Sequence, residues 1–199
     1  MKAILSSPAL YQAYQNAGGF FAARVKAISE YLTIRPGMRI IDIGCGPGYI
    51  LRHLPQGIDY VGFDIDEAYI DHARRSFGER GKFYCRYFDA AAADELTGTD
   101  IVMMNGVLHH IADEELRGTL ANIRDALKSG GVLFTLDGCY REGQSRLAKW
   151  LLDNDRGKFV RDQNGYDLVL RSVFENVDLV IRDDYARVPY TFVIGISRK

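Results

Sequence analysis

The stretch that most constrains the fold of this chain is a short apolar run followed by closely spaced glycines. Residues 39–43 are mostly branched and apolar, which is typical of a strand buried on both faces of a parallel sheet. Gly44, Gly46 and Gly48 follow, and they allow the backbone to turn sharply and to approach a ligand with no Cβ in between. We expect a helix to begin near Tyr49, with its unpaired N–H groups facing the same ligand.

The spacing of these glycines limits the kind of ligand. A dinucleotide-binding loop has the pattern Gly-x-Gly-x-x-Gly, but the sixth position here is Tyr49, which is too large to let the helix close onto the strand. A phosphate-binding loop ends in Gly-Lys-Ser/Thr, and neither Lys nor Ser follows Gly48. The pattern therefore favours a cofactor with an adenosine but no pyrophosphate, and a tight turn without a ligand is the alternative.

Composition and charge narrow the class of protein. The chain has 199 residues and a net charge of −1, so we expect one domain with a substantial core and no bulk attraction to nucleic acid or anionic membranes. Its cysteines, Cys45, Cys85 and Cys139, are widely spaced, which argues against a disulfide framework or a zinc cluster. No apolar run approaches the roughly 18 residues of a membrane-spanning helix, and no signal-peptide pattern is present, so the expected location is the cytoplasm.

Polar residues stand at or near the ends of five expected strands. The strands are expected at residues 39–43, 59–63, 83–88, 99–104 and 132–136. The polar residues are Asp42, Asp64, Asp89, Asn105 and Asp137. Because the carboxyl ends of parallel strands share one edge of a sheet, these side chains are expected to border one ligand site. Asp64 follows Gly44 by twenty residues, a spacing at which a carboxylate binds both ribose hydroxyls.

The remaining pattern predicts helices around this sheet and a lid over its edge. Helices are expected over residues 8–16, 20–32, 66–77, 113–128, 145–152 and 166–174, and terminal strands over 177–184 and 190–197. The polar run between residues 153 and 165 is longer than a minimal crossover, so we expect it to lie over the ligand-binding edge. We divide the single domain, residues 1–199, into an N-terminal helical cap (1–35), a cofactor-binding core (36–137), a substrate lid (138–175) and a terminal hairpin (176–199).

Taken together, these features resemble a class I S-adenosylmethionine-dependent methyltransferase. The resemblance covers residues 20–137 and rests on IDIGCGPGY, the acid in GFDID, Asp89 after the third strand, NGVLHHI, and LKSGG before the fifth strand. It implies an α/β, three-layer Rossmann-like fold with a seven-stranded, mostly parallel sheet. The implied strand order is 3-2-1-4-5-7-6 with the last strand antiparallel, and the terminal hairpin fits that order.

The resemblance also implies S-adenosylmethionine as cofactor, with S-adenosylhomocysteine as product. The implied cofactor-binding residues are Asp42, Gly44, Cys45, Gly46, Gly48, Asp64, Ile65, Phe88, Asp89, Ala90, Asn105 and Gly106. Among these, Asp64 would bind the ribose, Asp89 would accept from the adenine amino group, and Ile65 would pack on the adenine. Asp42 would orient the methionine amino group, directly or through water, and Asn105 would face the same group through its carbonyl. Cys45 would act through its backbone.

Methyl transfer from S-adenosylmethionine needs alignment of the acceptor with the methyl group and exclusion of water, because the leaving group is neutral. A base is needed only when the acceptor carries a proton that must leave. His109 and His110 are the candidate bases, and the alternative for either is packing with a local hydrogen bond. Candidate acceptor-binding residues are Tyr11, Tyr14, Tyr140 and Arg141. No metal site is predicted.

The sequence at the end of the fourth strand narrows the kinds of methyl acceptor that the chain is expected to use. Its sequence, Asn105-Gly106-Val107-Leu108, lacks the Asn/Asp-Pro-Pro-Tyr motif of enzymes that methylate exocyclic amino groups of bases or glutamine side chains. We therefore expect transfer to an oxygen or nitrogen of a small molecule by a monomer or homodimer, without nucleic acid or membrane partners. Two alternatives stay open: a nicotinamide-dependent oxidoreductase, which the glycine spacing opposes, and a non-catalytic S-adenosylmethionine-binding regulatory module.

Overall fold

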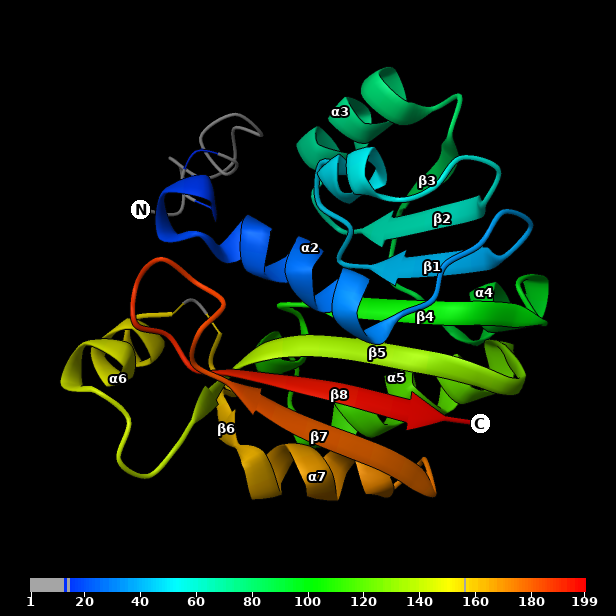
Figure 1. Ribbon diagram of the computed structural model, residues 1–199. Coiled ribbons are helices and arrows are strands. Elements are labelled where there is room, and N and C mark those ends of the chain that lie inside the picture. The colour runs from blue at the N-terminus through cyan, green and yellow to red at the C-terminus, as the bar shows by residue number, and fades with distance from the viewer. Residues whose placement is uncertain (1–12, 14, 156) are drawn as a thin grey trace.

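The computed structural model describes residues 13, 15–155 and 157–199, and a single sheet runs through the middle of it (Figure 1). The strands are β1 (Arg39–Ile43), β2 (Asp59–Asp64), β3 (Gly81–Cys85), β4 (Thr99–Asn105), β5 (Leu127–Tyr140), β7 (Asn176–Arg182) and β8 (Phe192–Arg198). Their order is β3-β2-β1-β4-β5-β8-β7. β8 runs antiparallel to its neighbours β5 and β7. The predicted fold and strand order are therefore confirmed, with β7 and β8 as the sixth and seventh strands.

Helices cover both faces of the sheet and make three layers (Figure 1). One core contains side chains of α2 (Phe20–Tyr31), η1 (Tyr49–His53) and α3 (Glu67–Phe77). The other contains side chains of α4 (Ala90–Glu95), α5 (Asp113–Ala126) and α7 (Gln163–Arg171). Along β1, Ile40 packs in the first core, whereas Ile41 and Ile43 pack in the second. This alternation explains why the strand is apolar at nearly every position.

Several predicted boundaries differ from the structure. The helix expected after the glycine loop is a five-residue 3₁₀ helix, η1, which ends before Leu54. The third strand ends at Cys85, because residues 86–89 leave the sheet and Asp89 caps the unpredicted helix α4. The fifth strand extends on both sides of its predicted range. Its end pairs with a further two-residue strand, β6 (Arg161–Asp162), which the sequence pattern did not indicate.

Helix α6, which belongs to the segment predicted to be a lid, lies beyond the carboxyl ends of the parallel strands. In Figure 1, the arrowheads of β1 and β2 point toward the side of the molecule where α6 (Arg146–Asp153) lies. Ser145 caps α6 by accepting a hydrogen bond from the backbone N–H of Ala148. Most of the helix predicted over residues 8–16 falls outside the described residues. Within the described part of the chain, no helix combines the length and apolar character needed to span a bilayer.

Candidate active site

The glycine loop folds tightly against the end of β2. Gly44, Gly46 and Gly48 have φ values of 74°, 55° and 77°, in the left-handed region that favours glycine. A Cβ on Gly44 would also lie 2.5 Å from a methyl carbon of Val107. The backbone N–H groups of Gly44 and Cys45 both donate to the Phe63 carbonyl, and the Cys45 carbonyl accepts from Gly48. The Cys45 backbone groups therefore hold the loop itself together, beyond the cofactor contact expected from sequence.

Asp64 joins this loop to the end of β2. Its Oδ2 accepts the Gly46 N–H at 2.8 Å, and its Oδ1 accepts the Asp66 N–H at 3.0 Å. Burial raises the pKa of the Asp64 carboxyl above its usual range. Each carboxylate oxygen has a further lone pair, so the group can accept additional hydrogen bonds.

Asp42 lies beneath the same edge and is only 3% exposed. Its Oδ2 accepts a hydrogen bond from the Tyr60 hydroxyl at 2.7 Å. Burial raises the pKa of Asp42 to about 6, against the opposing effects of the Tyr60 hydrogen bond and the Arg24 charge. This carboxyl therefore changes charge just below neutral pH. Tyr60 was missed in the sequence, because an aromatic residue inside an apolar strand gives no sign that its hydroxyl reaches a neighbouring strand.

Asn105, at the end of β4, has a buried side-chain amide without a protein partner. Neither Nδ2 nor Oδ1 makes a hydrogen bond within the described residues. Met103 is the register partner of Asp42, so Asn105, two residues further along, points to the same face of the sheet as Asp42. A buried amide without partners costs stability, and most buried polar groups in proteins are satisfied. The site therefore offers a donor and an acceptor to a polar ligand group.

The residues expected around an adenine, Ile65 and the consecutive Phe88, Asp89 and Ala90, have different structural roles. Asp89 Oδ1 accepts the Ala92 N–H at 2.9 Å and so caps α4. Phe88 is buried, with its ring 5.4 Å from that of Phe63. Ala90 begins α4 and is exposed. Ile65 is 61% exposed, which gives an apolar surface directly after Asp64.

Gly106 continues the turn after Asn105. Its φ of 73° requires glycine, and its N–H donates to the Leu136 carbonyl at 2.7 Å.

The thiol of Cys45 is buried near two carboxylates. Burial, followed by the charges of Asp42 and Asp64, raises the pKa of this thiol well above the usual value. The thiol therefore stays neutral and is a poor nucleophile.

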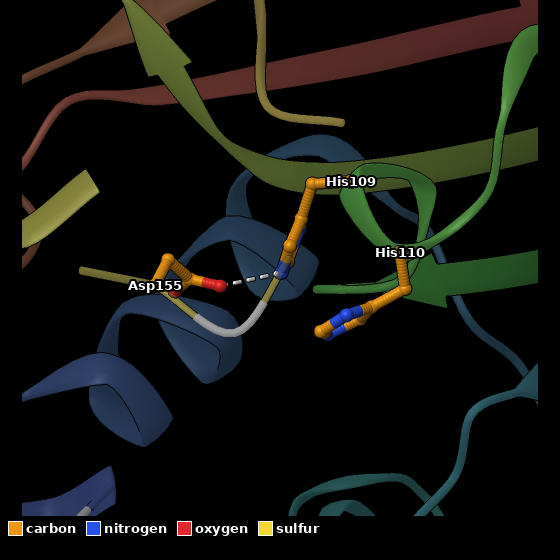
Figure 2. Close-up of side chains that lie close together, drawn as sticks. All are labelled: His109, His110 and Asp155. Atoms are coloured by element: carbon orange, nitrogen blue, oxygen red, sulfur yellow. Dashed lines mark ion pairs between the residues drawn. The ribbon is translucent and has the colours of Figure 1, made fainter. Parts of the chain in front are cut away.

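His109 lies between two carboxylates. Its Nδ1 is 2.6 Å from Oδ1 of Asp137, and its Nε2 is 3.2 Å from Oδ1 of Asp155 (Figure 2). Burial lowers the pKa of His109, but the hydrogen bonds to Asp137 and Asp155 outweigh it and raise the pKa to about 9. An imidazolium with both nitrogens engaged has no lone pair to offer. In this arrangement His109 cannot act as a general base, whereas His110 is exposed.

The side chains of His109, His110 and Asp155 lie close together (Figure 2), and among the described residues they form a group that could hold a metal ion. One potential ligand atom from each residue lies within 4.8 Å of the others. Both ring nitrogens of His109 are already accounted for by carboxylates, so ion pairing is sufficient to explain the cluster. The absence of a metal from the site stays a prediction.

Two candidate acceptor residues lie at the end of β5. Tyr140 and Arg141 border an open depression of about 550 Å³, together with Gln144, Lys149 and Asp153 among others. The Tyr140 hydroxyl donates to Asp153 at 2.9 Å, and Arg141 pairs with Asp183. None of the expected cofactor-binding residues lines this depression. The other two candidates, Tyr11 and Tyr14, lie outside the described residues.

Known proteins match both the sequence and the fold. Residues 41–133 match the profile of a family described as a methyltransferase domain. A ubiquinone biosynthesis O-methyltransferase of Cereibacter sphaeroides is 29% identical over 156 residues, which cover 71% of this chain and 62% of the relative. The reducing polyketide synthase BOA6 of Botryotinia fuckeliana is 27% identical over 199 residues, which cover 90% of this chain. The chain spans only 8% of the length of that synthase.

A solved structure extends the likeness over nearly the whole chain. It is a TehB-like SAM-dependent methyltransferase from Corynebacterium glutamicum, with a TM-score of 0.65 and 20% sequence identity. The superposition covers 95% of this chain and 94% of that one, which establishes the fold. Over residues 41–133 the chain is thus similar to this methyltransferase-domain family, and it shares its Rossmann-like α/β fold with a SAM-dependent methyltransferase.

Proposed function

We propose that this chain binds S-adenosylmethionine and methylates an oxygen or nitrogen of a small-molecule acceptor. The observation that carries the proposal is the buried Asn105 amide, which has no hydrogen-bond partner among the described residues and points to the same face of the sheet as Asp42. A cofactor with an ammonium group and a carboxylate would satisfy such an amide. The left-handed glycine loop beside Asp64 supports the same cofactor, because it leaves room for close approach of a ligand to the backbone.

In this proposal, each residue at the edge holds one part of the cofactor. Asp64 binds the ribose hydroxyls with the lone pairs that Gly46 and Asp66 leave free. Asp89 accepts from the adenine amino group while it caps α4, and Ile65 covers the ring. Asp42 orients the methionine amino group, directly or through water. The bound cofactor supplies a methyl group on a positively charged sulfur.

The chain's own contribution to the reaction is alignment, closure and, where needed, proton acceptance. A neutral leaving group needs no acid, so an ordered and water-free acceptor site supplies most of the catalysis. For an acceptor that loses a proton, His110 is the proposed base, because His109 is occupied by Asp137 and Asp155. Tyr140 and Arg141 are proposed to contact the acceptor from residues 138–175, which act as the lid.

The names of two relatives support the proposed class of methyl acceptor. The Cereibacter sphaeroides relative is named as an O-methyltransferase of ubiquinone biosynthesis, and the Botryotinia fuckeliana relative is a polyketide synthase. Both names favour a small organic acceptor, and the first favours oxygen. We propose that the protein works in the cytoplasm as a monomer or homodimer, without nucleic acid partners.

Calorimetry with two cofactors tests the proposal. We expect S-adenosylhomocysteine to bind with one site per chain and NADH to give no heat. Acceptors are then screened with a labelled methyl donor, and the labelled product identifies the methylated atom. Binding of NADH without binding of S-adenosylhomocysteine would overturn the proposal in favour of the oxidoreductase. S-adenosylhomocysteine binding without transfer to any acceptor would favour the regulatory module.

The pKa of Asp42 predicts how cofactor binding depends on pH. A nearby ammonium favours the ionised carboxylate, so binding releases a proton wherever free Asp42 is protonated. Since the pKa of Asp42 is raised to about 6, affinity for S-adenosylhomocysteine should fall as pH falls below that value. The limiting slope is about tenfold per pH unit by linkage. Calorimetry between about pH 5 and pH 8 measures it.

The matched control is Asp42→Asn, which cannot titrate and should lose this slope while binding more weakly at neutral pH. Asp59→Asn, on the exposed start of β2, should keep the wild-type slope. A flat affinity profile for the wild-type protein would refute the contact between Asp42 and the amino group.

A further inference from the structure

We propose that His109 is a positioning residue that fastens residues 157–162 of the lid, through Asp155, to the rim of the sheet. The fastening is a property of the fold, and its effect on catalysis rests on the function proposed above. His109 follows β4 in the short helix η2 (Leu108–His110), and Asp155 lies just beyond α6. The residue therefore connects the cofactor-binding core with the segment expected to cover the acceptor.

The side chain of His109 binds one element on each side. Asp137, on β5, is 1% exposed, and its Oδ1 lies 2.6 Å from Nδ1 and 3.3 Å from the His109 backbone nitrogen. This pair fixes the plane of the ring and points Nε2 away from the sheet. Nε2 then meets Asp155 Oδ1 at 3.2 Å (Figure 2). A side chain held on both nitrogens links the two segments more rigidly than either pair alone.

The lid backbone packs directly on the same ring. The Gly157 N–H donates to Asp155 Oδ1 at 2.8 Å, and the Phe159 N–H donates to the His109 carbonyl at 2.9 Å. A Cβ on Gly157 would lie 1.9 Å from the His109 ring, so only glycine permits this approach. The segment is therefore shaped to fit His109 and does not merely pass near it.

Arg161 supplies a second attachment that does not titrate. Its guanidinium donates to the carbonyls of Leu108 at 3.0 Å and Ile111 at 2.8 Å, and it pairs with Asp113 at the start of α5. The loop of residues 108–113 is thus bound to the lid at two points. Because Arg161 keeps its charge at all relevant pH values, only the His109 attachment responds to pH.

The charged groups around His109 set the direction of that response. Asp137 faces it from β5, Asp155 from the lid, and His110 from the same loop, with the ring centroids of the two histidines 4.2 Å apart. From α7, Tyr166 donates its hydroxyl to the Gly138 carbonyl beside Asp137. With the pKa of His109 raised to about 9, the attachment is complete below about pH 6.5 and is lost as pH rises through about 9.

Hydrogen exchange of the backbone amides tests the fastening without reference to methyl transfer. The probes are the Gly157 and Phe159 amides, measured near pH 7 in wild-type protein, in Asp155→Asn and in Asp167→Asn. Asp167 is a matched carboxylate on α7 that pairs only with Arg171 among the contacts described. We expect exchange at both probes to be about tenfold faster in Asp155→Asn, as loss of a charged hydrogen bond predicts, and unchanged in Asp167→Asn. Equal protection in all three proteins would overturn the proposal.

Kinetics test the positioning role once an acceptor is known. We expect Asp155→Asn to lower kcat or raise the KM for the acceptor by about tenfold while S-adenosylhomocysteine affinity stays at the wild-type value. The activity loss of the wild-type protein above about pH 9 should move to lower pH in this variant. An unfastened lid with unchanged kinetics would overturn the positioning role. Failure of S-adenosylhomocysteine to bind the wild-type protein would overturn only the proposed function, because the exchange result does not depend on it.

Discussion

Replacing Asp64 with alanine is expected to weaken S-adenosylhomocysteine binding by about 1–3 kcal/mol, or roughly 5- to 150-fold. The carboxylate joins the glycine loop to the end of β2 through the Gly46 and Asp66 amides. The variant would lose two ribose hydrogen bonds and would also leave the Gly46 N–H without its acceptor. Calorimetry near pH 8 measures the loss, since Asp42 is then ionised and does not complicate the comparison.

The control for this variant lies at the other end of the same strand. Asp59 pairs with Arg39 at the exposed start of β2, so Asp59→Ala should change the affinity by less than about twofold. Asp64→Asn keeps one acceptor oxygen and should give an intermediate loss. Wild-type affinity for S-adenosylhomocysteine in Asp64→Ala would refute the proposal that Asp64 binds the ribose hydroxyls, whatever role the other polar residues at this edge of the sheet have.

The sequence predicted the sheet and its strand order because the strands depend on local patterns. Branched apolar runs buried on two faces give parallel strands, and a polar residue stands at or near the end of each run. The closely spaced glycines predicted a sharp turn, and in the structure Gly44, Gly46 and Gly48 have left-handed backbone conformations. These patterns act within a few residues, so they can be recognised without knowledge of tertiary contacts.

The details that sequence missed depend on partners that are distant in the chain. The local sequence around His109 is compatible both with a general base and with a positioning residue. Its partners Asp137 on β5 and Asp155 beyond α6, which are distant in the chain, distinguish the two roles. Tyr60 likewise reaches Asp42 from a neighbouring strand. One omission was avoidable, because an aspartate followed by four alanines is a recognisable start of a helix, and Asp89 caps α4 in this way.

Arg161→Ala is expected to lower the free energy of unfolding by about 1.5–3 kcal/mol, the range for losing hydrogen bonds made by a charged group. The Arg161 side chain is 9% exposed, and its guanidinium binds Asp113 and the carbonyls of Leu108, Ile111 and Phe159. No smaller side chain can satisfy acceptors that lie in such different directions. Urea denaturation followed by circular dichroism gives the change from the shift in the midpoint at constant slope.

Arg198→Ala is the matched control, since the side chains of Arg198 on β8 and Asp178 on β7 are both exposed, so their ion pair should contribute less than about 1 kcal/mol. Arg161→Lys keeps the charge but not the planar fork, so its loss should fall between the two. A loss below about 1 kcal/mol for Arg161→Ala would mean that residues 108–113 and the lid separate without unfolding the sheet. In that case the attachment at Arg161 would be local, and His109 would carry the connection between the lid and the core.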